Sequence, residues 1–351
     1  MLDFKIDEFS VWEKLKNRTE PIVMYGTGNG ADKVLDILDG IGVEISGVTA
    51  SAGFVRERFF RGYPVKPIEY FEEIFGEFTV IITFGSSRPE VIDNIKSISQ
   101  RHKVLVPCVP VIENEIFDRV FLENHAKEIN LAYSVLADNF SKKIFSGYVN
   151  FQFGGELTSL FETETPESEA YTDILKLNKN ETFVDIGAYR GDTVAKFLKF
   201  CGGEYKNIVA AEPDFKTFSK LCENCGTLPR FKAINAAVTG IDGEVEFSQN
   251  AGRQSAVGKG TLTKSVTLAT LCEGISPSFI KIDSEGCELE ILKAGESILK
   301  EFKPKLNIAA YHKSEDIFTL PILIKNTVPE YEIHLRHHPY IPAWDTIFYC
   351  V

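Results

Sequence analysis

The sequence predicts an α/β protein built from two Rossmann-like, doubly wound sheets that a helical segment connects. Short apolar segments alternate with amphipathic helical patterns in two stretches of the chain, which is typical of parallel sheets covered by helices. The 351 residues exceed what one ordinary core holds and suit two. The last two expected strands are joined too closely to be parallel, which predicts an antiparallel hairpin at the end of the second sheet.

The expected strands fall into two groups. The first group comprises Ile22–Tyr25, Val43–Val48, Thr79–Phe84 and Lys103–Val106. The second comprises Thr182–Ile186, Asn207–Ala211, Phe231–Val238, Phe279–Ile282, Lys305–Ala310, Glu332–Arg336 and Thr346–Val351. A mostly helical stretch lies between them. We therefore expect an N-terminal domain over residues 1–110, a helical linker and lid over 111–177, and a second α/β domain over 178–351.

The connection between the last two strands limits the topology. Only eight residues, His337 to Trp344, separate Arg336 from Asp345. A parallel crossover needs about a dozen residues or more, usually including a helix. These two strands must therefore be antiparallel if they pair.

Composition excludes several classes of protein. The net charge of −12 makes nucleic acid an unlikely partner, because an acidic surface repels phosphates. No apolar segment approaches the ~20 residues of a membrane helix, and Met1 to Ser10 does not resemble a signal peptide. We expect no membrane partner and a cytoplasmic location. The seven cysteines indicate reduced thiols, although the Cys222–Cys225 pair leaves a zinc site as a minor alternative.

Two motifs in the second half predict a nucleoside site. The strand Thr182–Ile186 leads into Asp185-Ile186-Gly187-Ala188-Tyr189-Arg190-Gly191-Asp192-Thr193 and then a helix. The next strand ends at Glu212, whose carboxylate can accept hydrogen bonds from ribose hydroxyls. The alternative is a plain strand-to-helix turn in which Asp192 caps the helix.

The loop chemistry favours S-adenosylmethionine (SAM) over a dinucleotide. A dinucleotide needs bare glycines where its pyrophosphate approaches the backbone, whereas this loop carries Tyr189 and Arg190 at its centre. SAM has no phosphate and carries a sulfonium cation, which acidic neighbours such as Asp185 and Asp192 suit. We therefore predict SAM as the cofactor.

A second acidic motif follows the strand Phe279–Ile282. Asp283 and Glu285 come at the end of this strand, at the sheet edge where ligands collect in open α/β folds. The alternative is that Asp283 or Ser284 caps the next helix and that Glu285 only favours its N-terminus.

Together these motifs resemble the FkbM-type methyltransferase family. The resemblance rests on the Asp185 loop, Ala211-Glu212-Pro213, Asn235-Ala236-Ala237-Val238, Thr267-Leu268-Ala269-Thr270-Leu271, the Asp283 motif and Trp344-Asp345-Thr346, and covers about half the chain. Tyr189 and Ser284 depart from the commonest family pattern. The family methylates hydroxyls on sugars and secondary metabolites, so the resemblance implies a SAM-dependent O-methyltransferase.

The resemblance also implies residue roles. Gly187, Ala188 and Tyr189 would line the methionine end of SAM, and Glu212 would hold the ribose. Ala236 and Ala237 would pack on the adenine, and Asp283 would face the reacting centre. Asp185, Asp192 and Thr193 complete the expected cofactor set. The loop Gly252–Ser255 is either a substrate contact or a polar surface loop.

Two late histidines are candidates for a catalytic base. His312 follows the strand Lys305–Ala310, and His337 follows Glu332–Arg336. Because an imidazole titrates near neutral pH, either could remove a proton from an acceptor hydroxyl beside Asp283. No metal site is predicted, although a divalent metal held by Asp283 and a histidine stays open as an alternative.

The N-terminal block contains a glycine-rich loop of uncertain purpose. Gly26, Gly28 and Ala31 follow a strand and precede a helix, as in the dinucleotide fingerprint. The second strand lacks the acid that would bind an NAD ribose. The block is therefore either a positioning or a ligand-binding domain. A nicotinamide-dependent oxidoreductase and a non-catalytic nucleotide- or sugar-binding protein remain alternatives, and so does a homodimer.

Overall fold

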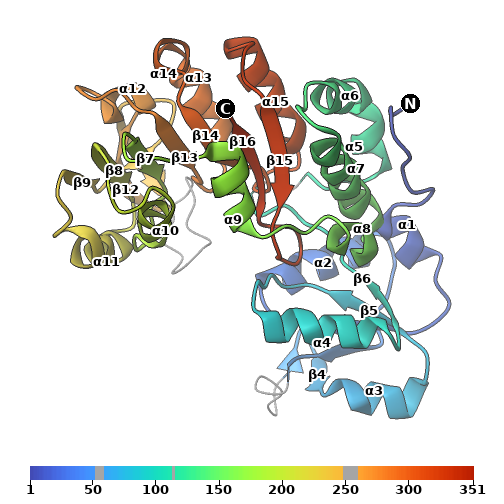
Figure 1. Cartoon of the computed structure of the whole chain (residues 1–351). Coiled ribbons are helices and arrows are strands. Elements are labelled where there is room, and N and C mark those ends of the chain that lie inside the picture. The colour runs from blue at the N-terminus through green and yellow to red at the C-terminus, as the bar shows by residue number, and fades with distance from the viewer. Residues whose placement is uncertain (52–58, 113–114, 248–259) are drawn as a thin grey trace.

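The computed structural model describes residues 1–51, 59–112, 115–247 and 260–351 (Figure 1). Two large sheets dominate the chain, and a group of helices lies beside them. Both large sheets consist mainly of parallel strands, as the sequence predicts. Among the described residues, no helix is both long enough and apolar enough to cross a membrane.

The first sheet has six strands in the order β3-β4-β2-β1-β5-β6, and β1 is parallel to both β2 and β5. Its strands are β1 (Ile22–Tyr25), β2 (Gly47–Thr49), β3 (Phe59–Phe60), β4 (Tyr63–Lys66), β5 (Thr79–Ile82) and β6 (Lys103–Leu105). Its helices are α1 (Val11–Lys16), α2 (Asn29–Gly40), α3 (Ile68–Phe75) and α4 (Pro89–Ser99). The segment Val43–Val48, predicted as a strand, enters the sheet only at Gly47. The sequence analysis missed β3 and β4, which are short and carry little apolar alternation.

The helical segment packs on the first sheet and beside the far edge of the second (Figure 1). Its elements are α5 (Arg119–Asn124), α6 (Ala126–Ser134), α7 (Asn139–Gly154), α8 (Leu157–Phe161), α9 (Glu167–Glu169) and the π-helix η1 (Ala170–Leu175). Asp118 and Asp138 cap α5 and α7, because their carboxylates accept backbone N–H groups three residues ahead.

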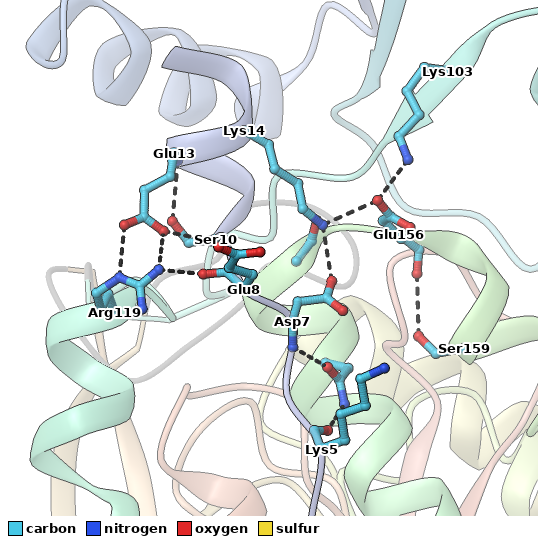
Figure 2. Close-up of polar contacts among 12 residues, drawn as sticks. Lys5, Asp7, Glu8, Ser10, Glu13, Lys14, Lys103, Arg119, Glu156 and Ser159 are labelled. Atoms are coloured by element: carbon cyan, nitrogen blue, oxygen red, sulfur yellow. Dashed lines mark hydrogen bonds and ion pairs between the residues drawn. The ribbon is translucent and has the colours of Figure 1, made fainter. Parts of the chain in front are cut away.

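Ion pairs fasten the N-terminal helix to this segment (Figure 2). The Arg119 guanidinium donates to both carboxylate oxygens of Glu13 at 2.8 Å. The Lys14 ammonium contacts Asp7 at 3.0 Å and Glu156 at 3.2 Å, and Lys103 of β6 contacts the same Glu156 carboxylate at 2.6 Å. The start of the chain, β6 and the residue that precedes α8 therefore share one polar network.

The second large sheet has seven strands in the order β15-β16-β14-β13-β7-β8-β9. They are β7 (Thr182–Ile186), β8 (Asn207–Ala211), β9 (Phe231–Ile234), β13 (Phe279–Ile282), β14 (Lys305–Ala309), β15 (Ile333–His337) and β16 (Thr346–Cys350). The accompanying helices are α10 (Asp192–Phe200), α11 (Phe215–Cys225), α12 (Leu268–Leu271), α13 (Glu288–Ala294), α14 (Glu296–Phe302) and α15 (Asp316–Thr327). The predicted hairpin is confirmed, because β16 is antiparallel to both β15 and β14.

The expected strand Phe231–Val238 is interrupted, which corrects the sequence prediction. Its first part is β9 of the large sheet, and its end is β10 (Ala237–Val238) of a separate sheet ordered β10-β12-β11. The side chain of Asn235 lies at the break and donates to the carbonyls of Glu212 and Pro213. The two further strands, β11 (Gly243–Phe247) and β12 (Thr261–Val266), were not predicted.

One apolar cluster contains residues of both large sheets and of the helical segment. It includes Val23 of β1, Phe145 of α7, Ile308 of β14 and Leu335 of β15, all completely buried. Backbone bonds also connect the two halves, since Ser86 and Ile341 exchange hydrogen bonds of 2.8 and 3.1 Å. The two sheets are therefore held in a fixed relation, and a site between them can be built from both.

Candidate functional site

The site lies where the strand order of the second sheet reverses. From β7 the chain continues outward through β8 and β9, and then returns to place β13 on the other side of β7. β7, β8, β13 and β14 are parallel, so their carboxyl ends meet at one edge. Such a switch point is where open α/β sheets bind ligands, because the two adjoining loops diverge there.

A cavity of about 810 Å³ opens at this edge. Most of the predicted site residues line it, namely Gly187, Tyr189, Asp192, Thr193, Glu212, Ala236, Ala237 and Asp283. Its wall also contains residues from the first sheet and the linker, including Asn29, Gly30, Lys33, Ser87 and residues 109–112. The cavity is therefore built between the two sheets. The loop Gly252–Ser255 lies outside the described residues.

Glu212, the acid predicted to bind the ribose, lines the cavity at the end of β8. Its Oε2 accepts the backbone N–H of Tyr189, and its Oε1 accepts that of Asp214, both at 2.9 Å. Burial raises the pKa of this carboxyl to about 7, although the two N–H groups lower it. The carboxylate is thus fixed in orientation and retains lone pairs for two ribose hydroxyls.

The loop after β7 needs the glycine at position 187. Gly187 has a φ of +72°, and a Cβ there would lie 1.9 Å from the carbonyl oxygen of Asp283. Only glycine therefore lets the β7 and β13 loops approach this closely. Tyr189 also has a positive φ, of 47°, as the loop turns toward Glu212. Gly191, not Asp192, is the N-cap of α10, which leaves the Asp192 side chain to line the cavity.

Asp185 and Ala188 lie beneath the cavity wall, and both are fully buried. Both carboxylate oxygens of Asp185 are without a hydrogen-bond partner among the described residues. Burial raises the pKa of Asp185 to about 6, while Lys281, 3.7 Å away, lowers it. Asp185, which was predicted to contact the cofactor, therefore lies behind the residues that line the cavity.

Lys281 is the site residue that the sequence analysis missed. It is buried in the middle of β13, directly across from Asp185 on β7 and Asn307 on β14. Its ammonium donates to the carbonyl of Gly187 at 2.9 Å and lies 3.6 Å from Asp283. Burial lowers the pKa of Lys281, but Asp283 and Asp185 outweigh it and raise the pKa overall. A lysine inside an otherwise apolar strand was the available signal, because lone buried ammonium groups are costly.

Asp283 is the ionised acid of the cavity. Its carboxylate accepts a hydrogen bond from the Tyr311 hydroxyl at 3.3 Å, and 33% of its side chain stays exposed. Burial raises the pKa of this carboxyl, but Lys281 and His312 outweigh burial and lower it. The alternative that Asp283 caps a helix is not what the structure shows. Ser284 makes the local contact instead, donating from its backbone and hydroxyl to Glu288.

His312 lies beside Asp283, and His337 does not. The Nε2 atom of His312 is 3.4 Å from both Asp283 and Glu285, and Nδ1 is 3.0 Å from Glu288. Burial opposes protonation, but these three carboxylates raise the pKa of His312 to about 10. Its ring is thus cationic at neutral pH in this arrangement.

The placement of His337 corrects the expectation that both histidines approach Asp283. β15 does end at the same edge as β14, but β16 lies between them. The His337 ring is buried, with Nδ1 3.2 Å from the Thr346 hydroxyl. Burial lowers its pKa to about 3, with His338 contributing. His337 is thus a buried neutral side chain of the sheet.

A mixed seven-stranded sheet with an acid at the end of the strand next to its first strand is typical of SAM-binding methyltransferases. Residues 185–344 match the sequence model of the Methyltransferase FkbM domain. This part of the chain is therefore similar to FkbM methyltransferase domains, and the similarity indicates SAM as the cofactor. No curated protein matches this chain in sequence.

Solved structures agree with this fold. The crystal structure of methyltransferase FkbM from Methylobacillus flagellatus KT has a TM-score of 0.73 and 21% identity, covering 99% of this chain and 94% of that chain. Precorrin-6y C5,15-methyltransferase from Geobacter metallireducens GS-15 has a TM-score of 0.34 and 12% identity, covering 54% and 92%. Fibrillarin from Aeropyrum pernix, with natively bound SAM, has a TM-score of 0.34 and 10% identity, covering 52% and 71%.

The described residues fit SAM. Glu212 offers a fixed acceptor to the ribose, and the small side chains of Ala236 and Ala237 leave room for a flat base. Asp192 and Asp283 supply negative charge to the middle of the cavity, where a sulfonium is favoured. The amide edge at Gly187 lies between these two ends.

The first prediction concerns the ribose contact. Glu212→Ala should weaken SAM binding by about 1.5–3 kcal/mol, because hydrogen bonds to a charged group are lost. That is roughly ten- to a hundredfold in affinity, measurable by titration calorimetry. Glu223→Ala, on the exposed side of α11, is the matched control and should bind SAM normally. Unchanged affinity in a folded Glu212 variant would refute the ribose assignment.

The second prediction concerns pH. Ribose hydroxyls donate to the ionised form of Glu212, whose pKa in the free protein is about 7. SAM affinity should therefore fall as the pH falls through 7, because binding then has to release a proton. Calorimetry from about pH 6 to about pH 8 tests this dependence. Glu212→Gln cannot titrate and should flatten the profile. A profile that is equally steep in this variant would assign the dependence to another group.

Proposed function

We propose that this chain transfers a methyl group from SAM to a hydroxyl oxygen of a sugar or another small hydroxylated metabolite. The observation that carries the proposal is the shared cavity. It is lined by the residues proposed to bind the cofactor, by the ionised carboxylate of Asp283, and by Asn29, Gly30 and Lys33 of the first domain. Bound SAM supplies an electrophilic methyl group, so the chain must supply a nearby oxygen and a place for its proton.

Asp283 is the proposed acceptor of that proton. A hydroxyl is a weak nucleophile until its proton is being removed, and the base must lie within hydrogen-bond reach. Asp283 faces the cavity and is held by Tyr311 and Lys281 from two sides. Because its pKa is lowered, it stays ionised at neutral pH. His312 lies behind it and is better suited to positioning than to accepting the proton directly, because its own pKa is raised.

The first sheet is proposed to complete the acceptor side. Asn29 and Gly30, at the start of α2, line the cavity together with Tyr340 and Trp344 of the hairpin connection. The Trp344 ring packs directly on Gly85, where a Cβ would lie 2.3 Å from it. Aromatic faces beside polar groups are suited to a sugar-like ligand. The glycine-rich loop of the first sheet would thus serve the acceptor rather than a second cofactor.

The third prediction concerns turnover. Asp283→Asn should lower the rate of methyl transfer by a factor of ~10²–10⁴, the usual contribution of acid–base catalysis. SAM affinity should change much less, because Glu212 and the Gly187 loop are intact. The acceptor is found first by screening hydroxylated sugars and metabolites with methyl-labelled SAM. Asp93→Asn, an exposed acid of α4, is the control and should keep full turnover. Full activity in Asp283→Asn would exclude this carboxylate as the base.

The fourth prediction separates the proposal from a nicotinamide-dependent oxidoreductase. A ligand raises the melting temperature only of a protein that binds it. SAM should therefore raise the melting temperature, and NAD should leave it unchanged. A Cβ at Gly28 would meet no atom within 4 Å among the described residues, so Gly28→Val tests the loop without disturbing its packing. An NAD-dependent shift that this substitution abolishes would favour the oxidoreductase.

A further inference from the structure

His312 is the centre of a buried acidic cluster. Its ring is completely buried in the turn after β14, and Nε2 has no hydrogen-bond partner among the described residues. The cluster consists of Asp283, Glu285 and Glu288, whose carboxylates contact the ring from two sides. From the sequence no metal site is predicted, and a divalent metal held by Asp283 and a histidine is left open as an alternative.

The Nε2 side of the ring faces a carboxylate pair. Oδ1 of Asp283 and Oε2 of Glu285 are each 3.4 Å from Nε2. Neighbouring ligands of a small divalent cation, bound at about 2.1 Å, lie roughly 3 Å apart. The two distances from Nε2 are thus close to the separation of neighbouring ligands on one cation.

The Nδ1 side is backed by a third carboxylate. Oε1 of Glu288 is 3.0 Å from Nδ1, and it is itself held by the backbone N–H and hydroxyl of Ser284 at 2.7 and 2.9 Å. Ligand atoms of Asp283, Glu288 and His312 all lie within 4.8 Å of one another. A carboxylate behind the imidazole is the usual outer partner of a metal-binding histidine.

The negative charge of the cluster and its access to the cavity both favour a bound cation. Three carboxylates surround one imidazole, and the Lys281 ammonium lies 3.6 Å from Asp283. Glu285 adopts a left-handed φ of 53°, which is uncommon for a non-glycine residue. Asp283 and Glu285 also line the cavity, so an ion and an acceptor oxygen can reach the cluster.

We infer that His312 Nε2, Asp283 and Glu285 bind one divalent cation of the Mn²⁺ or Mg²⁺ type, which displaces a proton from the ring, with Glu288 orienting the imidazole from behind. Carboxylate oxygens favour such hard cations, and the imidazole makes Mn²⁺ the stronger binder of the two. The cation faces the cavity beside the expected position of the acceptor hydroxyl. Binding of the cation does not depend on the identity of that acceptor.

The test measures metal binding without any methyl acceptor. The full-length protein is freed of metal with a chelator and titrated with MnCl₂, while electron paramagnetic resonance reports the free Mn²⁺. The wild type should bind one Mn²⁺ per chain, and added Mg²⁺ should compete. Glu288→Gln should weaken binding roughly 10- to 100-fold, as expected for the outer partner of a metal ligand. His312→Gln should abolish stoichiometric binding.

Controls separate this site from general effects. His125→Gln, at the start of α6 and outside the cluster, should bind Mn²⁺ like the wild type. Melting curves verify that each variant folds, and Glu285→Gln replaces His312→Gln if the latter does not. Absence of stoichiometric Mn²⁺ binding in the wild type, or unchanged binding in a folded ligand variant, overturns the inference. Mn²⁺ binding without methyl transfer to any hydroxyl would refute the proposed function and leave the cation site standing.

Discussion

The buried ammonium of Lys281 is the constraint on which the rest of the site depends. A charged amine in the middle of a central strand is tolerated only if its surroundings neutralise and hydrogen-bond it. Asp185 from β7, Asp283 from the end of β13 and the carbonyl of Gly187 meet this need together. The same contacts hold the two diverging loops at the switch point at a fixed separation. The cofactor loop and the proposed base are therefore positioned by one buried charge.

Much of the fold could be predicted from the sequence, because buried parallel strands read as short apolar segments. β1, β7, β8 and β13 have the predicted bounds, and the length of the connection sufficed for the antiparallel hairpin. The predictions failed where tertiary contacts override the local pattern. Asn235 breaks a continuous apolar segment by bonding to the neighbouring loop, and β11 and β12 consist largely of polar residues.

For the site, the sequence was sufficient to predict which strand ends carry the site residues. Glu212 and Asp283 follow β8 and β13, and the parallel topology alone brings them to one edge. The distances between side chains along that edge were not predictable, because they depend on strand order. His312 and His337 both end strands that point the same way, yet only His312 is next to Asp283, since β16 enters between β14 and β15. The roles of Lys281 and Glu288 could not be predicted, because they depend on neighbours from other strands and turns.

The glycine-rich loop of the first sheet resembles a dinucleotide-binding motif, but the position of the sheet explains its glycines in another way. Gly26 is required because a Cβ there would lie 2.5 Å from the Thr83 hydroxyl, and Gly30 because one would lie 2.4 Å from the Thr83 carbonyl oxygen. Both glycines are thus explained by packing of the loop on the residue that follows β5. The linker continues this contact, since the N–H of Ile112 donates to the carbonyl of His312 at 3.1 Å. The first sheet is therefore attached, through its linker, to the turn that carries the acidic cluster. A ligand that contacts Asn29 or Lys33 would reach the same cavity as one that contacts Asp283, which couples acceptor binding to the geometry of the reacting centre.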